Sequence, residues 1–511
     1  MEKIEKDTEI HRIQKAAKEL LGLGKEANED LCFPDATVVI HVDPEIARTQ
    51  GGQTCLVSLI TMLGRMKSIV KQIELSMPAG ISVCPNTLLD SNDLLEGLAD
   101  FLESLTGEKS KHEVRFFHGV YTTSPTVRVA IGRIRIPDNC DVLIEADSFA
   151  AYINHRSDQS NWNTPFPFGP MAAAALGVAE IFKHILRANY PDVNDRSIWF
   201  LENTAHSLMT YGLPLSGKKI SLPVEIDLGN IAISGVGAGG SAVVYALSAL
   251  PSLKGDLTLA DPGLHKLSNL ARYLLSDYLD VTRRTSKVLV ASQFLSRYHP
   301  ELFVRSFEKE FDEIKIPDLD MVVSTTDSVE SRWLLQRTWP PVILDAGVIN
   351  TLYSVARITS GNGFCLGCKH PYDPFLAERR IARMWGISLK QLNALKSSGA
   401  RVTLEDIERL AEAQGRDISD FLELLDTPFT EIPAISNCGD ARFDLSVPNQ
   451  AASLPFVTTL ASITLAAEIV KTKIYPEYVL DNWYTHDMLK APKPSLHKFR
   501  NSKSECHICG G

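Results

Sequence analysis

The chain has 511 residues, 44% of them hydrophobic and 22% charged, enough for roughly two to four domains whose cores need no disulfide bonds. Its 52 basic and 62 acidic residues give a formal charge of −10, which argues against a nucleic-acid-binding protein, because phosphates are neutralised by a basic surface. The charged first 20 residues carry no secretory signal, and the longest uncharged stretch, residues 445–467, contains prolines and polar side chains, so we expect a cytoplasmic protein without a membrane span.

The first 220 residues carry a weak version of a doubly wound α/β pattern. ATVVIHVD (36–43) predicts a buried strand, GGQTCLVSLITMLGRM (51–66) a glycine-containing turn and helix, and KSIVKQIELSM (67–77) a second strand. The turn lacks the full glycine spacing of a nucleotide site. We therefore expect a degenerate Rossmann-like unit here.

One segment of this first half recurs near the end of the chain. PFGPMAAAALGVAEIFK, from Pro167, aligns without gaps with PFVTTLASITLAAEIVK, from Pro455, and seven of the 17 positions are identical. Two alanine-rich amphipathic helices can look alike through composition alone. Because both copies end in Glu-Ile-x-Lys, we favour a tandem pseudo-repeat.

The second copy begins with a complete nucleotide-binding pattern. NIAISGVGAGGSAVVYALSALPSLKGDLTLADPG, from Asn230, predicts a strand, turn, helix and strand, with Gly235, Gly237 and Gly240 on G-x-G-x-x-G spacing. These glycines let main-chain N–H groups and the helix N-terminus approach a phosphate, and Asp261 at the next strand end can accept ribose hydroxyls. Alone, the pattern indicates a nucleotide and fits a dinucleotide-dependent oxidoreductase equally well.

Polar residues further along favour ATP. Asn269, Arg272 and Lys287 follow the ribose acid, so a loop and a helix expected over 285–300 can aim two cations at a triphosphate. The strands expected over 320–327 and 341–347 come next, and Asp327, followed by Arg332, ends the first of them, where a carboxylate can hold Mg²⁺. Singly, such residues are more often surface charges or helix caps; together, they indicate a triphosphate site.

An extra segment, from residue 374 to about 433, separates these strands from the repeated helix. It reads as a small helical insertion, with a capping box from Thr403 to Asp406 and a stop at Gly415. Cys438, in AISNCGDARF, follows it in a polar loop. A lone cysteine is commonly a small buried hydrophobe, but an exposed loop thiol suits a nucleophile.

Four cysteines form two C-x-x-C pairs far apart in the chain, Cys365 with Cys368 and Cys506 with Cys509. Four thiolates match a closed structural zinc site, and a redox-active C-x-x-C is the competing interpretation. The other five cysteines stand alone, as free thiols do in a reducing compartment. The terminal Gly-Gly looks like the tail of a ubiquitin-like modifier, but residues 472–505 are too short and polar for a β-grasp domain, so we interpret it as an end following a zinc ligand.

The order of these motifs from residue 230 to 509 resembles the ThiF-type adenylating enzymes, which include the activating enzymes for ubiquitin-like proteins. The resemblance implies two tandem Rossmann-like adenylation domains in one chain, as in eukaryotic ubiquitin-activating enzymes and the activating enzymes of bacterial ubiquitination-like defence operons. The expected division is a degenerate domain (1–225), the active ATP-binding domain (226–373), a helical insertion with a catalytic-cysteine loop (374–440) and the rest of the active domain with its zinc-binding end (441–511).

The resemblance also assigns roles to the residues. Gly235, Gly237 and Gly240 would form the phosphate turn, Asp261 would bind ribose, Asn269, Arg272 and Lys287 would hold the triphosphate of ATP, and Asp327 would hold Mg²⁺. Arg12 is the candidate for an arginine lent by the first domain. Cys438 would form a thioester with the adenylated modifier and pass it to the cysteine of a conjugating enzyme. The chain would act as a monomer with an internal pseudo-dimer or as a homodimer.

Two positions depart from the family pattern, because Gly263 replaces a usual acid and Tyr273 a usual glutamine. Three other functions stay open beside thioester formation. The enzyme could adenylate a sulfur-carrier protein or a peptide without forming a thioester, both halves could be degenerate and serve as a scaffold, or the chain could be a nicotinamide-dependent oxidoreductase. The last would leave the SNLAR and C-x-x-C segments unexplained.

Overall fold

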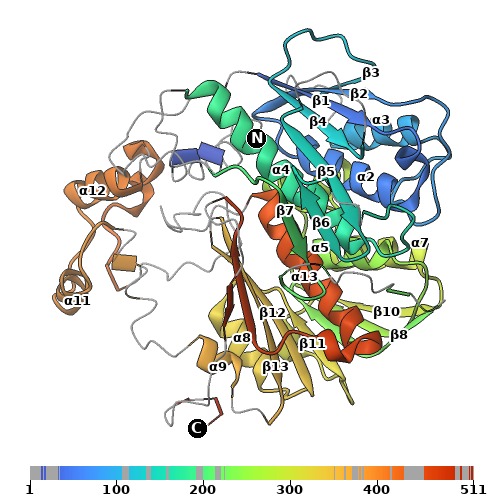
Figure 1. Ribbon diagram of the computed structural model, residues 1–511. Helices are drawn as coiled ribbons and strands as arrows, with labels where there is room; N and C mark the ends of the chain where they lie inside the picture. The colour runs from blue at the N-terminus through green and yellow to red at the C-terminus, as the bar shows by residue number, and fades with distance from the viewer. Residues whose placement is uncertain are drawn as a thin grey trace.

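The fold is taken from a computed structural model of the chain (Figure 1). It describes residues 13–14, 17–18, 33, 35–105, 114–133, 140–156, 160–191, 199–212, 214, 220–221, 223, 225–349, 351–361, 364–370, 378, 381–382, 385–414, 417–430, 454–489, 495–497, 506 and 508–509.

The first half forms a seven-stranded sheet in the order β3-β2-β1-β4-β5-β6-β7. The first five of these strands run parallel, and β6 and β7 are antiparallel additions. Helices α2, α3 and α4 accompany the sheet, and the expected strand, helix and strand over 36–77 are confirmed as β1, α2 and β2. The bounds are β1 Ala36–Val42, α2 Gln50–Gly64, β2 Val70–Ser76, α3 Leu94–Ser104, β3 Arg115–His118, β4 Val127–Ile131, β5 Val142–Asp147, β6 Ala150–Ile153, α4 Phe168–Asn189 and β7 Thr204–Ser207.

The second half repeats this topology in an eight-stranded sheet, β10-β9-β8-β11-β12-β13-β14-β15, again with five parallel strands followed by antiparallel ones. The expected pair of Rossmann-like sheets is therefore confirmed. The bounds are β8 Ile226–Ser234, α5 Ala238–Ser248, β9 Leu253–Ala260, α6 Tyr278–Arg283, α7 Lys287–Tyr298, β10 Leu302–Phe307, β11 Met321–Ser324, α8 Val329–Gln336, β12 Val342–Ile349, β13 Leu352–Thr359, α9 Leu366–Lys369, α13 Pro455–Ile474, β14 Trp483–Asp487 and β15 Ser495–His497.

The two recurring segments are α4 and α13, which occupy equivalent places in the two halves and pack against each other between the sheets (Figure 1). Each carries a buried ion pair between residues one helical turn apart, Glu180 with Lys183 and Glu468 with Lys471. In each pair the glutamate also accepts a main-chain N–H from the segment that follows its helix, Leu201 at 3.0 Å and Leu480 at 2.9 Å. The Glu-Ile-x-Lys motif therefore makes the same ion pair and the same main-chain contact in both halves, as a tandem repeat predicts.

Packing of α2, α4, α5 and α13 joins the halves into one continuous hydrophobic core. The helices are rich in alanine, glycine and small polar residues on their contact faces, which lets their axes approach closely. Burial on this scale is the main stabilising contribution to the joined halves. None of the helices that the structure describes is both long and apolar enough to span a lipid bilayer.

The helical insertion stands apart from both sheets (Figure 1) and has its own small core around Trp385 and Phe429. Its described helices are α11 Leu389–Ser397 and α12 Leu404–Gln414. The predicted capping box is confirmed: Thr403 N–H donates to Asp406 Oδ2 at 3.0 Å, and Asp406 N–H donates to Thr403 Oγ1 at 3.2 Å.

Candidate functional site

The glycine turn lies between β8 and α5, at the carboxyl end of the parallel strands. Gly235 adopts a left-handed φ of +84°, which disfavours any residue with a side chain. A Cβ atom on Gly240 would lie 2.1 Å from the carbonyl oxygen of Gly235, so α5 can start this close to the strand only with glycine there. Gly237 is the N-cap of α5, and the first N–H groups of that helix therefore face the turn.

Asp261 supports the turn from the end of β9. The residue is 8% exposed, and its carboxylate accepts hydrogen bonds from the N–H groups of Val236 at 2.8 Å and Gly263 at 2.7 Å. Lys287 Nζ lies 3.4 Å from Oδ1 of the same carboxylate. Oδ2 keeps a second lone pair that can accept a ribose hydroxyl, so the position suits the expected role.

The two predicted cations share one aromatic ring. Arg272 Cζ lies 5.7 Å and Lys287 Nζ 5.5 Å from the ring centroid of Tyr273, within cation–π range. The Tyr273 hydroxyl would lie 3.3 Å from a Cβ atom on Gly237, which places the ring beside the glycine turn. Tyr273 stands where the family pattern usually has glutamine. In the structure, its ring brings the two cations together at the turn.

Two further residues shape this loop. Asn269 is buried, and its Oδ1 accepts the N–H of Lys266 at 2.9 Å, so it helps to fold the loop that carries Arg272. Gly263 leaves space for the lysine, because a Cβ atom there would lie 2.5 Å from Lys287 Nζ. Lys287 thus occupies the room that the usual acid would need.

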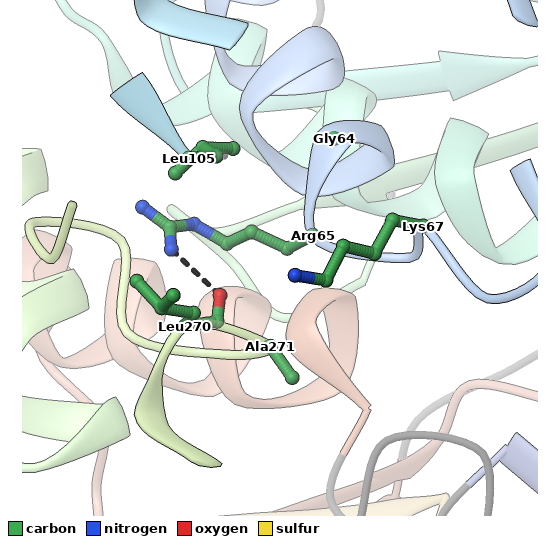
Figure 2. A pocket seen from close by; sticks show the side chains of 6 residues that line it. All are labelled: Gly64, Arg65, Lys67, Leu105, Leu270 and Ala271. Atoms are coloured by element: carbon green, nitrogen blue, oxygen red, sulfur yellow. Dashed lines mark hydrogen bonds between the residues drawn. The ribbon is translucent and has the colours of Figure 1, made fainter. Parts of the chain in front are cut away.

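Arg65 is a contributor that sequence analysis did not identify. It caps the end of α2 in the first half, and its guanidinium donates to the carbonyl oxygen of Leu270 in the second half (Figure 2). It also donates to the carbonyl oxygens of Leu274 and Ser276. The pKa of Arg65 is lowered to about 9 by burial. A small pocket at this contact is lined by Gly64, Arg65, Lys67, Leu105, Leu270 and Ala271.

Acidic side chains follow strands β10 and β11. Asp327 is exposed just after β11, two residues beyond Thr325, whose hydroxyl donates to the carbonyl oxygen of Gly235 at 2.5 Å. Burial and the negative charges of Asp261, Asp312 and Asp327 raise the pKa of Glu310, which follows β10. Repulsion of this kind indicates a local negative potential that a bound cation would relieve.

The four paired cysteines come together in space. All four Sγ atoms lie within 4.8 Å of one another, and the separations include 3.7 Å for Cys365–Cys368, 3.5 Å for Cys365–Cys506 and 3.6 Å for Cys368–Cys509. Tetrahedral Zn–S bonds of about 2.3 Å place sulfur atoms about 3.8 Å apart, so the four thiols fit a zinc ion. Burial raises the pKa of Cys365 and Cys368, whereas at Cys506 the N–H groups of Cys509 and Ile508 outweigh burial and lower the pKa to about 7.

A model of the ThiF family matches residues 225–508, which is more than half of the chain. The chain belongs to the ThiF family. A second family model, the BilD N-terminal domain, matches residues 37–200 of this ThiF-family protein. Since the motifs of the ThiF family are those of adenylating enzymes, the protein is an ATP-dependent adenylating enzyme.

Individual relatives of this ThiF-family protein are distant. An uncharacterized protein, y4jF, from Sinorhizobium fredii (strain NBRC 101917 / NGR234) is 25% identical over 456 residues, covering 85% of this chain and 81% of that protein. Crystal structures of E. coli MccB with ATP and of the microcin C7 biosynthetic enzyme MccB with N-formylated MccA are 16% and 17% identical, with TM-scores of 0.36 and 0.35. Each covers 55% of this chain, over 66% and 67% of the MccB chain respectively.

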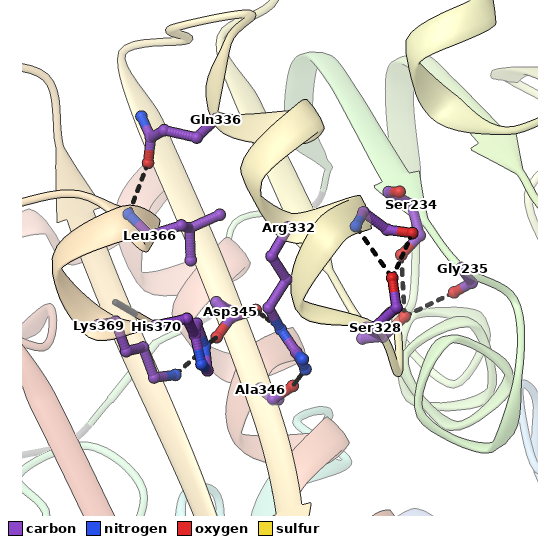
Figure 3. Close-up of polar contacts among 12 residues, drawn as sticks. Ser234, Gly235, Ser328, Arg332, Gln336, Asp345, Ala346, Leu366, Lys369 and His370 are labelled. Atoms are coloured by element: carbon purple, nitrogen blue, oxygen red, sulfur yellow. Dashed lines mark hydrogen bonds and ion pairs between the residues drawn. The ribbon is translucent and has the colours of Figure 1, made fainter. Parts of the chain in front are cut away.

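Arg332 does not serve the phosphate turn of this ThiF-family protein, so that part of the prediction is wrong. Its Nε donates to Asp345 Oδ1 at 2.9 Å and its Nη2 to the carbonyl oxygen of Ala346 at 3.0 Å, away from Gly235 (Figure 3). Asp345 also pairs with Lys369 Nζ at 2.6 Å. The buried carboxylate attracts the guanidinium more strongly than a solvated turn can, and no local pattern in the sequence indicates that partner.

We expect the Asp345→Asn substitution to destabilise the protein by about 3–5 kcal/mol, because Arg332 and Lys369 would be left buried without their carboxylate. Those neighbours, with His370, outweigh burial and hold the pKa of Asp345 well below its ordinary 3.8. A depressed carboxyl pKa stabilises the fold above the unfolded value, so the difference from wild type should be full at pH 7 and shrink only below about pH 4. Urea unfolding of both proteins, at pH 7 and below about pH 4, measures this difference in the free energy of unfolding.

The control for this prediction is Asp426→Asn, which removes an exposed ion pair with Arg401 and should cost at most about 1 kcal/mol. A loss at Asp345 as small as that at Asp426 would contradict the buried-cluster account.

Two predicted functional residues, Arg12 and Cys438, lie outside the residues that the structure describes. The other predicted site residues fall into two groups. One surrounds the glycine turn and consists of Gly235, Gly237, Gly240, Asp261, Asn269, Arg272, Lys287 and Asp327, and the other is the cysteine cluster.

Proposed function

We propose that this protein activates a ubiquitin-like modifier in two steps. It first uses ATP to adenylate the C-terminal glycine of the modifier, and Cys438 then takes the acyl group as a thioester for transfer to the cysteine of a conjugating enzyme. The observation that carries the adenylation step is the glycine turn, with Asp261, Arg272 and Lys287 gathered around the start of α5.

The arrangement supports ATP as the nucleotide. The N–H groups at the start of α5 and the cations Arg272 and Lys287 would hold the phosphates, and Asp261 would hold the ribose. Asp327 is the proposed ligand for Mg²⁺, which would supply further neutralisation of phosphate charge. The modifier's carboxylate oxygen attacks the α-phosphorus, the bond to the β-phosphate oxygen breaks, and pyrophosphate leaves. The cations stabilise the charge that develops on the phosphates.

The helical insertion supports the thioester step. Adenylation alone does not need such an insertion, whereas Cys438 lies eight residues beyond its last described residue, 430, and before α13. The thiolate of Cys438 would attack the acyl carbon of the adenylate and release AMP. The alternative, adenylation of a sulfur-carrier protein or peptide without a thioester, is the other outcome of the test below.

The cysteine cluster is the proposed zinc site, with Cys365, Cys368, Cys506 and Cys509 as ligands. Four protein ligands leave no open position, so the metal would stabilise structure rather than take part in the reaction. It would tie residues 506–509 to α9, where a Cβ atom on Gly367 would meet Ile508 at 2.5 Å.

The test is incubation of the protein with ATP, Mg²⁺ and a candidate ubiquitin-like protein, followed by non-reducing electrophoresis. We expect a thiol-sensitive adduct in the wild type that Cys438→Ala abolishes, while ATP–pyrophosphate exchange continues at a similar rate. Cys140→Ala, which removes an exposed free thiol, is the matched control and should keep the adduct. Exchange without any adduct would favour the alternative, and a complete lack of exchange with every modifier or peptide tried would contradict the proposal.

A further inference from the structure

Arg65 is a buried cation that crosses from the first half of the molecule to the nucleotide-binding half. It directly follows α2 and is 2% exposed. Its Nη1 donates to Leu270 O at 2.7 Å (Figure 2). Its Nη2 donates to Leu274 O at 2.8 Å and Ser276 O at 3.0 Å. All three acceptors are main-chain oxygens of one loop, residues 267–276. The guanidinium therefore stabilises the main-chain conformation of that loop, whatever side chains Leu270, Leu274 and Ser276 carry.

The same loop carries the side chains that face the glycine turn. Arg272 and Tyr273 lie between the first and second carbonyl groups that Arg65 holds, and Tyr273 is 4% exposed. Its ring lies under both Arg272 and Lys287 and beside Gly237. A shift of this loop would therefore move Arg272 relative to the turn and displace the ring over which Lys287, at the start of α7, lies.

The contacts within the loop are short-range turns, such as Arg272 N–H to Asn269 O at 3.0 Å and Tyr273 N–H to Asn269 O at 2.8 Å. Buried carbonyl groups of an irregular segment need donors, and a planar guanidinium can serve several at fixed angles. Arg65 supplies these donors from outside the nucleotide-binding half. The first half thus contributes directly to the geometry of the loop, although its own turn lacks the nucleotide-binding glycine spacing.

We propose that Arg65 is a positioning residue through which the first half of the chain holds Arg272 and Lys287 in place for the phosphates of ATP. This inference rests on the proposed function, because it takes the glycine turn as the ATP site. Arg65 itself touches neither the turn nor the nucleotide in this account. It acts through Tyr273 and the carbonyl groups around it, so its loss should affect phosphate recognition and spare the ribose and base.

The test compares the binding of Mg·ATP, by isothermal titration, with the binding of adenosine, by ligand-observed NMR, in the full-length protein. We expect Arg65→Met to weaken ATP at least about tenfold, as for one misplaced charge-assisted hydrogen bond to a phosphate, with adenosine affinity unchanged. Arg65→Lys keeps the charge but not the planar fork, and should weaken ATP at least about threefold.

Lys471→Met is the matched control. Lys471 is another buried cation that donates to carbonyl groups of the opposite half, Leu208 O at 2.9 Å and Met209 O at 3.4 Å, far in sequence from the loop. It should lower the melting temperature and leave the ratio of ATP to adenosine affinity unchanged.

Wild-type ATP affinity in Arg65→Met would overturn the inference, as would equal weakening of ATP in Lys471→Met. If Arg65→Met does not fold, Arg65→Lys decides, and unchanged ATP affinity in that variant overturns the inference. A wild-type protein that binds no ATP would instead overturn the proposed function itself, and the inference with it.

Discussion

Replacing Lys287 with methionine is expected to slow ATP–pyrophosphate exchange by about 10²–10³-fold, the cost typical of removing one group that stabilises developing charge. Lys287 is the first residue of α7, and its ammonium lies beside Asp261 and over Tyr273, at the edge of the glycine turn. The effect is measured as the initial rate of ATP–pyrophosphate exchange at saturating ATP. The modifier used is the one that forms a thioester in the assay described above.

Arg297→Met is the control for Lys287→Met, because it removes a cation from the last turn of the same helix. Arg297 forms an exposed ion pair with Asp90, and the side chains are 56% and 85% exposed, so little stability or activity should be lost. The melting temperature of both variants separates an effect on the reaction from one on folding. An exchange rate for Lys287→Met within threefold of wild type would remove this residue from the proposed site.

Removal of residues 506–511 is expected to release one zinc ion per chain and to destabilise the nucleotide-binding half by several kcal/mol. The deletion takes away Cys506 and Cys509, half of the ligand set, and binding free energies of about 10–16 kcal/mol in small zinc-finger peptides show how much stability such a site can contribute. Elemental analysis of the purified protein and thermal unfolding measure the two effects. In the wild type, acid should release the metal, because protons compete with zinc for the thiolates.

The double variant Cys506→Ser and Cys509→Ser tests the same prediction at full chain length, and Cys84→Ser, outside the cluster, is its control. Unchanged metal content and melting in the deletion would refute the zinc assignment.

Much of the fold around the nucleotide site follows from local pattern. The glycine spacing at Gly235, Gly237 and Gly240 predicted a strand-to-helix turn, and the structure has β8 ending at Ser234 and α5 beginning at Ala238. The helix expected over 285–300 is α7, Lys287–Tyr298, with Ser286 at its N-cap position, although the side chain makes no capping hydrogen bond. Glycine conformation, capping and hydrophobic periodicity act over a few residues, so they can be read directly from the chain.

The tandem repeat was also visible in the sequence, because the two copies share an unusual buried pair. Glu180 with Lys183 and Glu468 with Lys471 are charged residues buried within mainly apolar helices, a combination that composition alone does not explain. The chemistry of the cysteines likewise predicted their grouping. That Cys365 and Cys506 meet across 141 residues, with sulfur atoms 3.5 Å apart, depends on how β13, α13 and β14 bring the chain back.

The sequence by itself therefore determined the family, the turn and the kinds of residue around it, whereas the tertiary structure decided which charges are available to a ligand. Arg332 and Arg65 are both arginines close to site segments in sequence or space. In the structure, Arg332 pairs with Asp345, and Arg65 donates to the carbonyl groups of the 267–276 loop. The physical reason is that a buried charge takes the partner that compensates its lost hydration, and only the packing of distant segments decides which partner lies within reach.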